Sequence, residues 1–145
     1  MKYLPLIGGR IKNRPLTEIY IQALLKELDL HKLRSFPLQI QFSRVLDDCI
    51  GLCEGSKKYV MITIATYDEG RKLTYLEMMK TLAHELVHAR QFIRGQLNAS
   101  LDGWKWKGRF ANNYEYTNQP WEKEAYRLEK ILFLKCFPLD ATFNQ

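Results

Sequence analysis

Alternating apolar and polar residues predict strands in the first half of the chain. The stretch from Leu38 to Ser43 alternates between apolar and polar side chains, the pattern expected of a strand. The stretch from Tyr59 to Ala65 is rich in β-branched residues and nearly continuously apolar, which favours a second strand. Gly51 between them indicates turns, and a short third strand is expected near residues 50–54.

A helical spacing of apolar residues begins near Thr17. The pattern continues to about Leu30, so we predict a helix there, with Thr17 as its N-cap and Pro15 just outside it. Residues 1–15, which precede this helix, show neither the helical spacing nor the strand alternation of apolar residues, and they are expected to form an irregular arm.

Two further helices are predicted in the second half. Thr74 and Glu77 have the spacing of a capping box, and the run that follows has no Gly or Pro until it stops at Gly95. Pro120 is expected to begin a last helix that continues to about Phe137, with its apolar face formed by Trp121, Ala125, Leu128 and Leu132. Between these helices, residues 104–110 could form a strand. The expected fold is α+β, with a short mixed sheet.

Length and composition predict one domain that covers residues 1–145. The chain is long enough to bury a core, and it contains no internal repeat or long linker. We expect no membrane span, because no stretch approaches about 18 consecutive apolar residues. Pro5 and a Gly pair interrupt the first apolar run, so no export signal is expected.

The cysteines and the net charge bear on the expected cellular compartment and binding partners. Three cysteines without Cys-x-x-Cys spacing suggest neither a disulfide framework nor a zinc ribbon, so a reducing cytoplasm is expected. The net charge of +6 favours acidic partners, but Lys and Arg are spread along the chain, which favours a solvated basic surface over a dedicated nucleic-acid site. Residues 104–107 alternate Trp with Lys and could bind single-stranded nucleic acid, or be a strand whose Trp residues pack inward.

The predicted helix after Thr74 carries a motif with metal chemistry, His84-Glu85-Leu86-Val87-His88. Residues four apart lie one turn apart on the same helix face, so His84 and His88 can bind one ion. Glu85 is rotated by about 100° from His84, which suits a base that accepts a proton from a metal-activated water. Zinc suits such a site, because it accepts imidazole and carboxylate ligands and leaves one position open.

The third metal ligand is less clearly indicated by the sequence than His84 and His88 are. A motif that continues to a third histidine would need Gly at 91 and His at 94, but the chain has Gln91 and Arg94. His31 is better explained as a partner of a helix C-terminus. The remaining downstream donors are Asp102, Glu115, Glu122, Glu124, Glu129, Asp140 and, as a distant option, Cys136.

The motif and the downstream pattern Glu122-x-x-Ala125 resemble the gluzincin class of zinc peptidases, over the region from Tyr59 to about Lys135. In size and element order the chain also resembles the small SprT-like zincins, and around Pro120 it resembles small phage-encoded peptidases. It departs from the SprT-like proteins in having no His after His88 that could be the third ligand, and from many gluzincins in having Tyr126 where they place an acidic residue.

This resemblance implies a small zincin-like fold and a zinc-dependent metalloprotease that hydrolyses peptide bonds in a protein or peptide substrate. Glu122 would be the third ligand, in preference to Glu124, and Glu85 the general base. It also implies that the strand at residues 59–65 binds substrate, unless that strand is internal. The donor for the transition-state oxyanion remains open among Arg109, Tyr114, Tyr116 and Tyr126. The alternative is a zinc-stabilised binding or regulatory module without proteolytic activity.

Overall fold

A computed structural model describes residues 5–32, 38–111 and 114–138 as a mixed α+β fold. Its main sheet has the order β1-β2-β4-β3, formed by β1 (Leu6–Gly8), β2 (Leu38–Ser43), β3 (Gly51–Ser56) and β4 (Tyr59–Ala65). β2 is parallel to both β1 and β4, whereas β3 pairs antiparallel with β4. β4 is therefore internal, and β3 forms one edge of the sheet.

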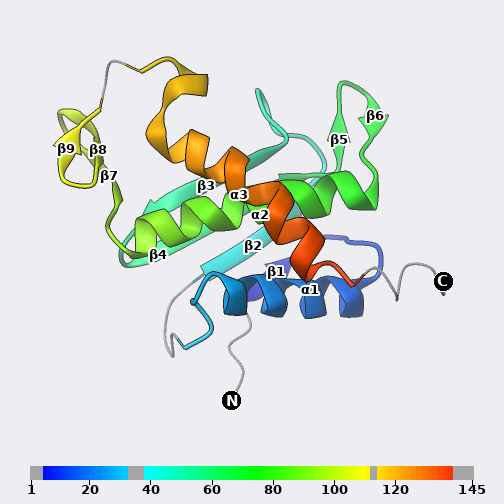
Figure 1. The fold of residues 1–145 in the computed structure, drawn as a ribbon. Coiled ribbons are helices and arrows are strands. Elements are labelled where there is room, and N and C mark those ends of the chain that lie inside the picture. The colour runs from blue at the N-terminus through cyan, green and yellow to red at the C-terminus, as the bar shows by residue number, and fades with distance from the viewer. Residues whose placement is uncertain (1–4, 33–37, 112–113, 139–145) are drawn as a thin grey trace.

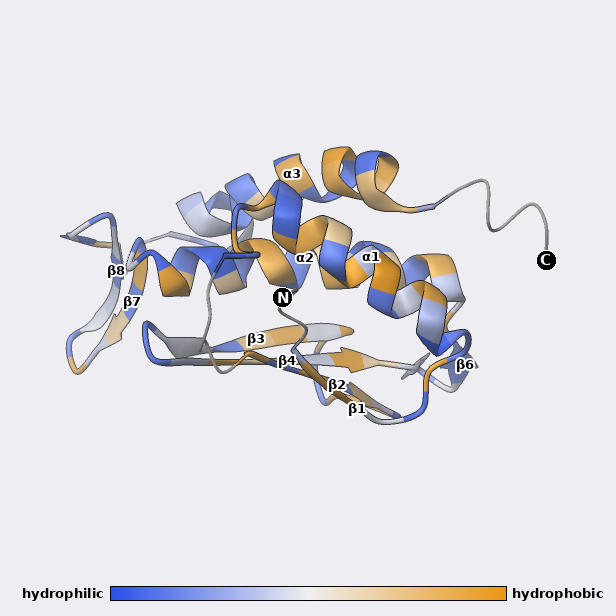
Figure 2. Ribbon diagram, turned by 90° about the horizontal axis from the view of Figure 1, so that it is seen from below, coloured by the Kyte–Doolittle hydropathy of each residue, from blue (hydrophilic) through white to orange (hydrophobic). Residues whose placement is uncertain are grey.

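Three helices lie on one side of this sheet: α1 (Arg14–Glu27), α2 (Tyr75–Ile93) and α3 (Pro120–Cys136) (Figure 1, Figure 2). α2 lies against β3 and β4, and α3 packs on α2 and α1. The alternation predicted for β2 is seen in its burial, because Leu38, Ile40 and Phe42 are buried while the intervening residues are not. These side chains form the core between the sheet and the helices.

Smaller elements lie at the two ends of the main sheet (Figure 1). A two-stranded hairpin precedes α2, and a three-stranded antiparallel sheet followed by a 3₁₀ turn lies between α2 and α3. They are β5 (Tyr67–Asp68), β6 (Arg71–Lys72), β7 (Leu97–Ser100), β8 (Gly103–Trp106), β9 (Arg109–Phe110) and η1 (Tyr116–Asn118). None of the helices in the described ranges is long and apolar enough to span a membrane.

Several predicted elements are confirmed. β2 and β4 have the predicted bounds, and β3 begins one residue later than expected. The capping box is formed in both directions, because Thr74 Oγ1 accepts from Glu77 N and the Glu77 carboxylate accepts from Thr74 N. Gly95 follows the helix end with φ +71°, as a C′ glycine does. α3 begins at Pro120 and ends one residue before Phe137.

The prediction for the N-terminal region was wrong in two respects. The expected irregular arm contains β1, which pairs with β2, and α1 begins at Arg14 and not at Thr17. Its N-cap is Asn13, a left-handed residue with φ 56° whose side chain accepts from Leu16 N, and Pro15 occupies the first turn. Pro suits that position because the first amides of a helix have no partner within it.

The expected single strand at residues 104–110 is also corrected. Lys107 and Gly108 both have positive φ and form a tight turn, so the segment divides into β8 and β9. Trp104 and Trp106 both lie near the ring of Trp121, at centroid distances of 6.1 and 6.2 Å. These tryptophans therefore contribute to packing at the start of α3.

Tyr20 connects α1 to the other two helices. Its side chain is fully buried, its hydroxyl donates to the carbonyl of Met79 at 2.8 Å, and its ring contacts Phe133 and Phe137 edge-on. A buried hydrogen bond contributes about 1 kcal/mol net. The hydroxyl of Tyr20 is thus one of the few polar ties between α1 and α2.

We expect Tyr20→Phe to lower the free energy of unfolding by about 1 kcal/mol, because it removes that hydrogen bond and keeps the ring. Urea denaturation followed by circular dichroism measures the change. The matched control is Tyr59→Phe at an exposed position, where a change within about 0.5 kcal/mol is expected. Equal stability of the Tyr20 variant and the wild type would contradict this assignment.

Candidate metal centre

α2 buries three chemically active side chains in its central turns. His84, Glu85 and His88 are only 5–8% exposed, although such residues usually lie at the surface. The two imidazoles lie one turn apart, with ring centroids 5.0 Å from each other. This is the arrangement that the four-residue spacing predicts on a helix.

Glu122, in the first turn of α3, completes the cluster. Its Oε1 lies 3.0 Å from His84 Nε2 and 3.1 Å from His88 Nε2. Ala125, one turn later, is fully buried, and its small side chain permits α3 to lie close to α2. The ligand atoms of the three residues all lie within 4.8 Å of one another, so this buried group could hold a metal ion.

The donor set fits zinc. Ligand bonds of about 2.0–2.2 Å in tetrahedral geometry require donor atoms roughly 3.3 Å apart, and two of the separations are close to that value. Two imidazoles with one carboxylate are also a common ligand set of catalytic zinc.

The charges in the cluster depend strongly on one another. Burial alone would raise the pKa of Glu122, but hydrogen bonds from His84 and His88 outweigh it and lower that pKa to about 2. Burial opposes the charged form of His84, but its contacts with Glu122 and Glu129 raise its pKa to about 9. A proton on His84 therefore balances the charge of the buried carboxylate, a role that a bound cation could take over.

Gln91 orients His88. Its Oε1 accepts a hydrogen bond from His88 Nδ1 at 2.8 Å, which leaves Nε2 as the nitrogen that faces Glu122. Its Nε2 donates to the carbonyl of Trp121 at 3.0 Å and to Glu124 Oε1 at 3.2 Å. The fully buried amide therefore fixes the imidazole tautomer and connects α2 to the first turn of α3.

Tyr126 and Glu129 surround His84. The Tyr126 ring packs against the imidazole at a centroid distance of 4.7 Å. Tyr126 therefore gives His84 an aromatic neighbour, at the position where many gluzincins have an acidic residue. Glu129, one turn later on α3, places Oε1 3.5 Å from His84 Nδ1. Each imidazole thus has a polar partner at Nδ1 and faces Glu122 through Nε2.

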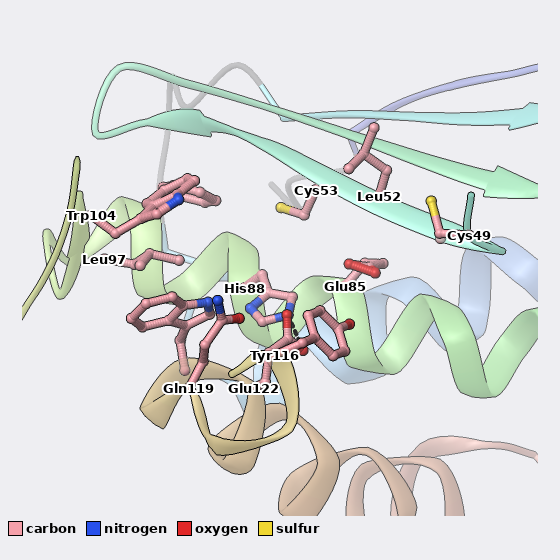
Figure 3. A pocket seen from close by; sticks show the side chains of 13 residues that line it. Cys49, Leu52, Cys53, Glu85, His88, Leu97, Trp104, Tyr116, Gln119 and Glu122 are labelled. Atoms are coloured by element: carbon pink, nitrogen blue, oxygen red, sulfur yellow. Dashed lines mark hydrogen bonds and ion pairs between the residues drawn. The ribbon is translucent and has the colours of Figure 1, made fainter. Parts of the chain in front are cut away.

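A cavity of about 330 Å³ opens beside the cluster and is lined by Glu85, His88 and Glu122 (Figure 3). β3 forms its opposite wall, where Gly51 lies so close that an added Cβ would come within 3.0 Å of Glu85 Oε2 and 2.4 Å of Thr81 Cγ2. Burial raises the pKa of Glu85, although the nearby imidazoles oppose the shift. This favours proton acceptance by Glu85.

The structure distinguishes among the residues predicted as third ligand and as oxyanion donor. Of the downstream oxygen donors within the described residues, only Glu122 joins both histidines, whereas Glu124 contacts Gln91 and Arg90. Asp140 lies outside the described residues. Of the four candidate oxyanion donors, Tyr116 lines the cavity and Tyr126 packs on His84. The sequence left open whether residues 59–65 bind substrate or form an internal strand; β4 is internal, and β3 lies at the edge.

Sequence reasoning missed the contributions of Gln91, Glu129 and β3. Gln91 stands three residues after His88, so its place on the same helix face was a usable signal. Glu129 was considered as a ligand but contacts the outer nitrogen of His84. The packing of β3 over Glu85 had no local signal beyond Gly51 itself.

No protein-family model matches the chain, and no curated protein matches it. The function is therefore inferred from the chemistry of the cluster and its cavity.

We expect zinc affinity to fall in a defined order when the carboxylates are replaced one at a time. Glu122→Ala should give the largest loss, well over tenfold, because it removes a donor atom. Glu129→Gln should weaken binding by about 10- to 100-fold, because it withdraws the negative partner of His84 Nδ1. Glu124→Ala should lose less than Glu122→Ala.

Competition with a chromophoric chelator measures the dissociation constants. Glu69→Gln, an exposed carboxylate in the turn between β5 and β6, is the charge-matched control and should bind zinc as the wild type does. A larger loss in Glu124→Ala than in Glu122→Ala would transfer the ligand role to Glu124.

Proposed function

We propose that the protein is a zinc-dependent metallopeptidase of gluzincin type with a small zincin-like fold. The observation that carries the proposal is the buried His84, His88 and Glu122 cluster beside an open cavity that also contains Glu85. The order of elements supports it, because a sheet strand precedes the helix with the two histidines and a later helix supplies the carboxylate.

The roles of the residues follow from their positions. When bound, zinc would polarise the scissile carbonyl and acidify a water molecule. His84, His88 and Glu122 would hold the ion, with Gln91 and Glu129 fixing the imidazoles from behind. Glu85 would accept the proton of the attacking water and pass it to the leaving amine, as its buried position and raised pKa favour.

The substrate is best explained as an extended peptide that pairs with the edge of β3. Gly51, Leu52 and Cys53 of that strand line the same cavity as Glu85 (Figure 3). Main-chain hydrogen bonds to an edge strand accept many sequences, and the cavity would receive one side chain. β3 therefore takes the role that the sequence suggested for residues 59–65.

Tyr116 is the best-placed oxyanion donor. It lies in η1 and lines the same cavity as Glu85 and Glu122 (Figure 3). Burial and a hydrogen bond with Tyr126 raise its pKa, so its hydroxyl keeps its proton at neutral pH. A protonated phenol can donate a hydrogen bond to a developing oxyanion.

A zinc-stabilised binding module is the competing function. Structural zinc sites are usually closed by four protein ligands, whereas the group among the described residues contains three. Such a module would also have no use for a carboxylate base, yet Glu85 is buried beside the cluster.

We expect Glu85→Gln to retain one equivalent of zinc and the wild-type circular dichroism spectrum, but to lose hydrolysis by about 10²- to 10⁴-fold. The change removes the base and keeps the size of the side chain. Peptide-library cleavage followed by mass spectrometry, together with metal analysis, measures both properties.

His88→Ala is the comparison variant and should lose zinc as well as activity. Unchanged turnover in Glu85→Gln would exclude Glu85 as the base. A zinc-loaded wild type that cleaves no peptide in the library would favour the binding module.

Tyr116→Phe is expected to lower kcat by about 10²- to 10³-fold with little change in KM, because the hydroxyl acts on the transition state and not on the bound substrate. Steady-state kinetics on a peptide found in the library measure the two constants. Tyr114→Phe, an exposed neighbour, is the matched control. A rise in KM with unchanged kcat would instead make Tyr116 a substrate-binding residue.

A further inference from the structure

A second cavity, of about 900 Å³, lies at the N-terminal end of α2, away from the metal centre in the central turns of that helix. Along the helix axis, about 15 Å separate Thr74, at the edge of this cavity, from His84. The wall follows the carboxyl ends of the parallel strands β1, β2 and β4 and the start of α2, and consists of residues 10–12, 42–44, 66–67, 72–75 and 78. Crevices at the carboxyl ends of parallel strands are common ligand sites.

Four cations line this second cavity and no carboxylate does. They are Arg10, Lys12, Arg44 and Lys72, and each is exposed. Within the described parts of the chain, none of them forms an ion pair, and the nearby carboxylate of Glu77 is engaged by Arg71 and the Thr74 amide. Because like charges around one cavity repel each other, a bound anion would stabilise the arrangement.

Backbone contacts fix the segments that carry Arg10, Lys12 and Arg44. Pairing of β2 with β4 continues beyond the strand ends, since Thr66 N donates to Ser43 O at 2.8 Å and Tyr67 N to Arg44 O at 2.9 Å. The Arg44 guanidinium lies 4.8 Å from the centroid of the Tyr67 ring. Gly9 touches the end of β2, where an added Cβ would lie 2.1 Å from Phe42 O. The Arg10–Lys12 turn is therefore fixed against β2.

The other residues that line the second cavity indicate which chemical groups the bound anion would contain. Ser43, Thr66 and Thr74 add hydroxyls to the lining, and its apolar and aromatic residues are Ile11, Phe42, Leu73, Met78, Tyr67 and Tyr75. Arg and Lys side chains with hydroxyls suit phosphate oxygens, and aromatic rings suit a planar group. A concave cavity of this size suits a small molecule.

We propose that this cavity binds a small phosphorylated ligand with an aromatic ring, the chemistry of a free nucleotide. The phosphates would lie against Arg10, Lys12, Arg44 and Lys72, and the ring against the tyrosines. The site is separate from the metal centre and does not depend on the proposed peptidase activity.

Isothermal titration of the full chain with ATP, AMP, pyrophosphate and adenosine, at about 0.15 M salt, tests the proposal. We expect one equivalent of ATP to bind, AMP and pyrophosphate to bind more weakly, and adenosine to give no measurable heat. ATP should also raise Tm, because a ligand that binds only the folded state stabilises it.

The double variant Arg44→Ala/Lys72→Ala should weaken ATP binding by about tenfold or more, because charge-assisted hydrogen bonds are lost. Its matched control is Lys57→Ala/Lys58→Ala in the turn between β3 and β4, which removes the same charge far from the cavity and should bind as the wild type does. Circular dichroism and zinc content verify that both variants fold.

His88→Ala should keep ATP binding, which separates this cavity from phosphate binding at a metal ion. The proposal is overturned if no probe binds saturably, if the two double variants lose affinity equally, or if His88→Ala abolishes binding. It is also overturned if a twelve-residue oligothymidylate binds more tightly than ATP, since the cavity would then be part of a nucleic-acid surface.

Discussion

A buried carboxylate held between two imidazoles from another helix is the contact on which the candidate site depends. Glu122 of α3 reaches both His84 and His88 of α2, and all three side chains are nearly inaccessible to solvent. A buried charge is costly unless its partners are in place, and removing one partner of such a group typically costs several kcal/mol. The docking of α3 on α2 is therefore tied to the charge state of the cluster.

Neighbouring residues hold the contact of Glu122 with the two imidazoles in its geometry. Gln91 and Glu129 engage the outer nitrogens of the imidazoles, so that the inner nitrogens face Glu122. Ala125 permits the close approach of the helices, and Gly51 permits β3 to pass over Glu85. Small residues thus stand where backbones approach closely, and polar residues stand where the rings need a fixed orientation.

Elements with strong local signals were predicted from the sequence, whereas those that depend on distant contacts were not. β2, β4 and α2 have clear periodicity and, for α2, a capping box, so their bounds follow from neighbouring residues. β1 is only three residues long and is a strand because β2 lies beside it. Asn13 caps α1 from a left-handed conformation, which its sequence neighbours did not indicate.

The same distinction applies to the sites. The spacing of His84 and His88 is a local property of one helix, but the choice between Glu122 and Glu124 depends on the angle at which α3 docks. The four cations of the second cavity are spread over residues 10–72, so composition showed only a basic chain. The fold, and not the sequence spacing, gathers them.

The position of Glu122 would give a bound ion a mechanical role as well as a chemical one. Two donors belong to α2, which packs on the sheet, and the third belongs to α3, which packs on the other helices. An ion bound by all three is a crosslink between the layers, so the detachment of α3 and the escape of the ion become a single event. Binding of the ion would then stabilise the docking of α3 on α2 as well as the site itself.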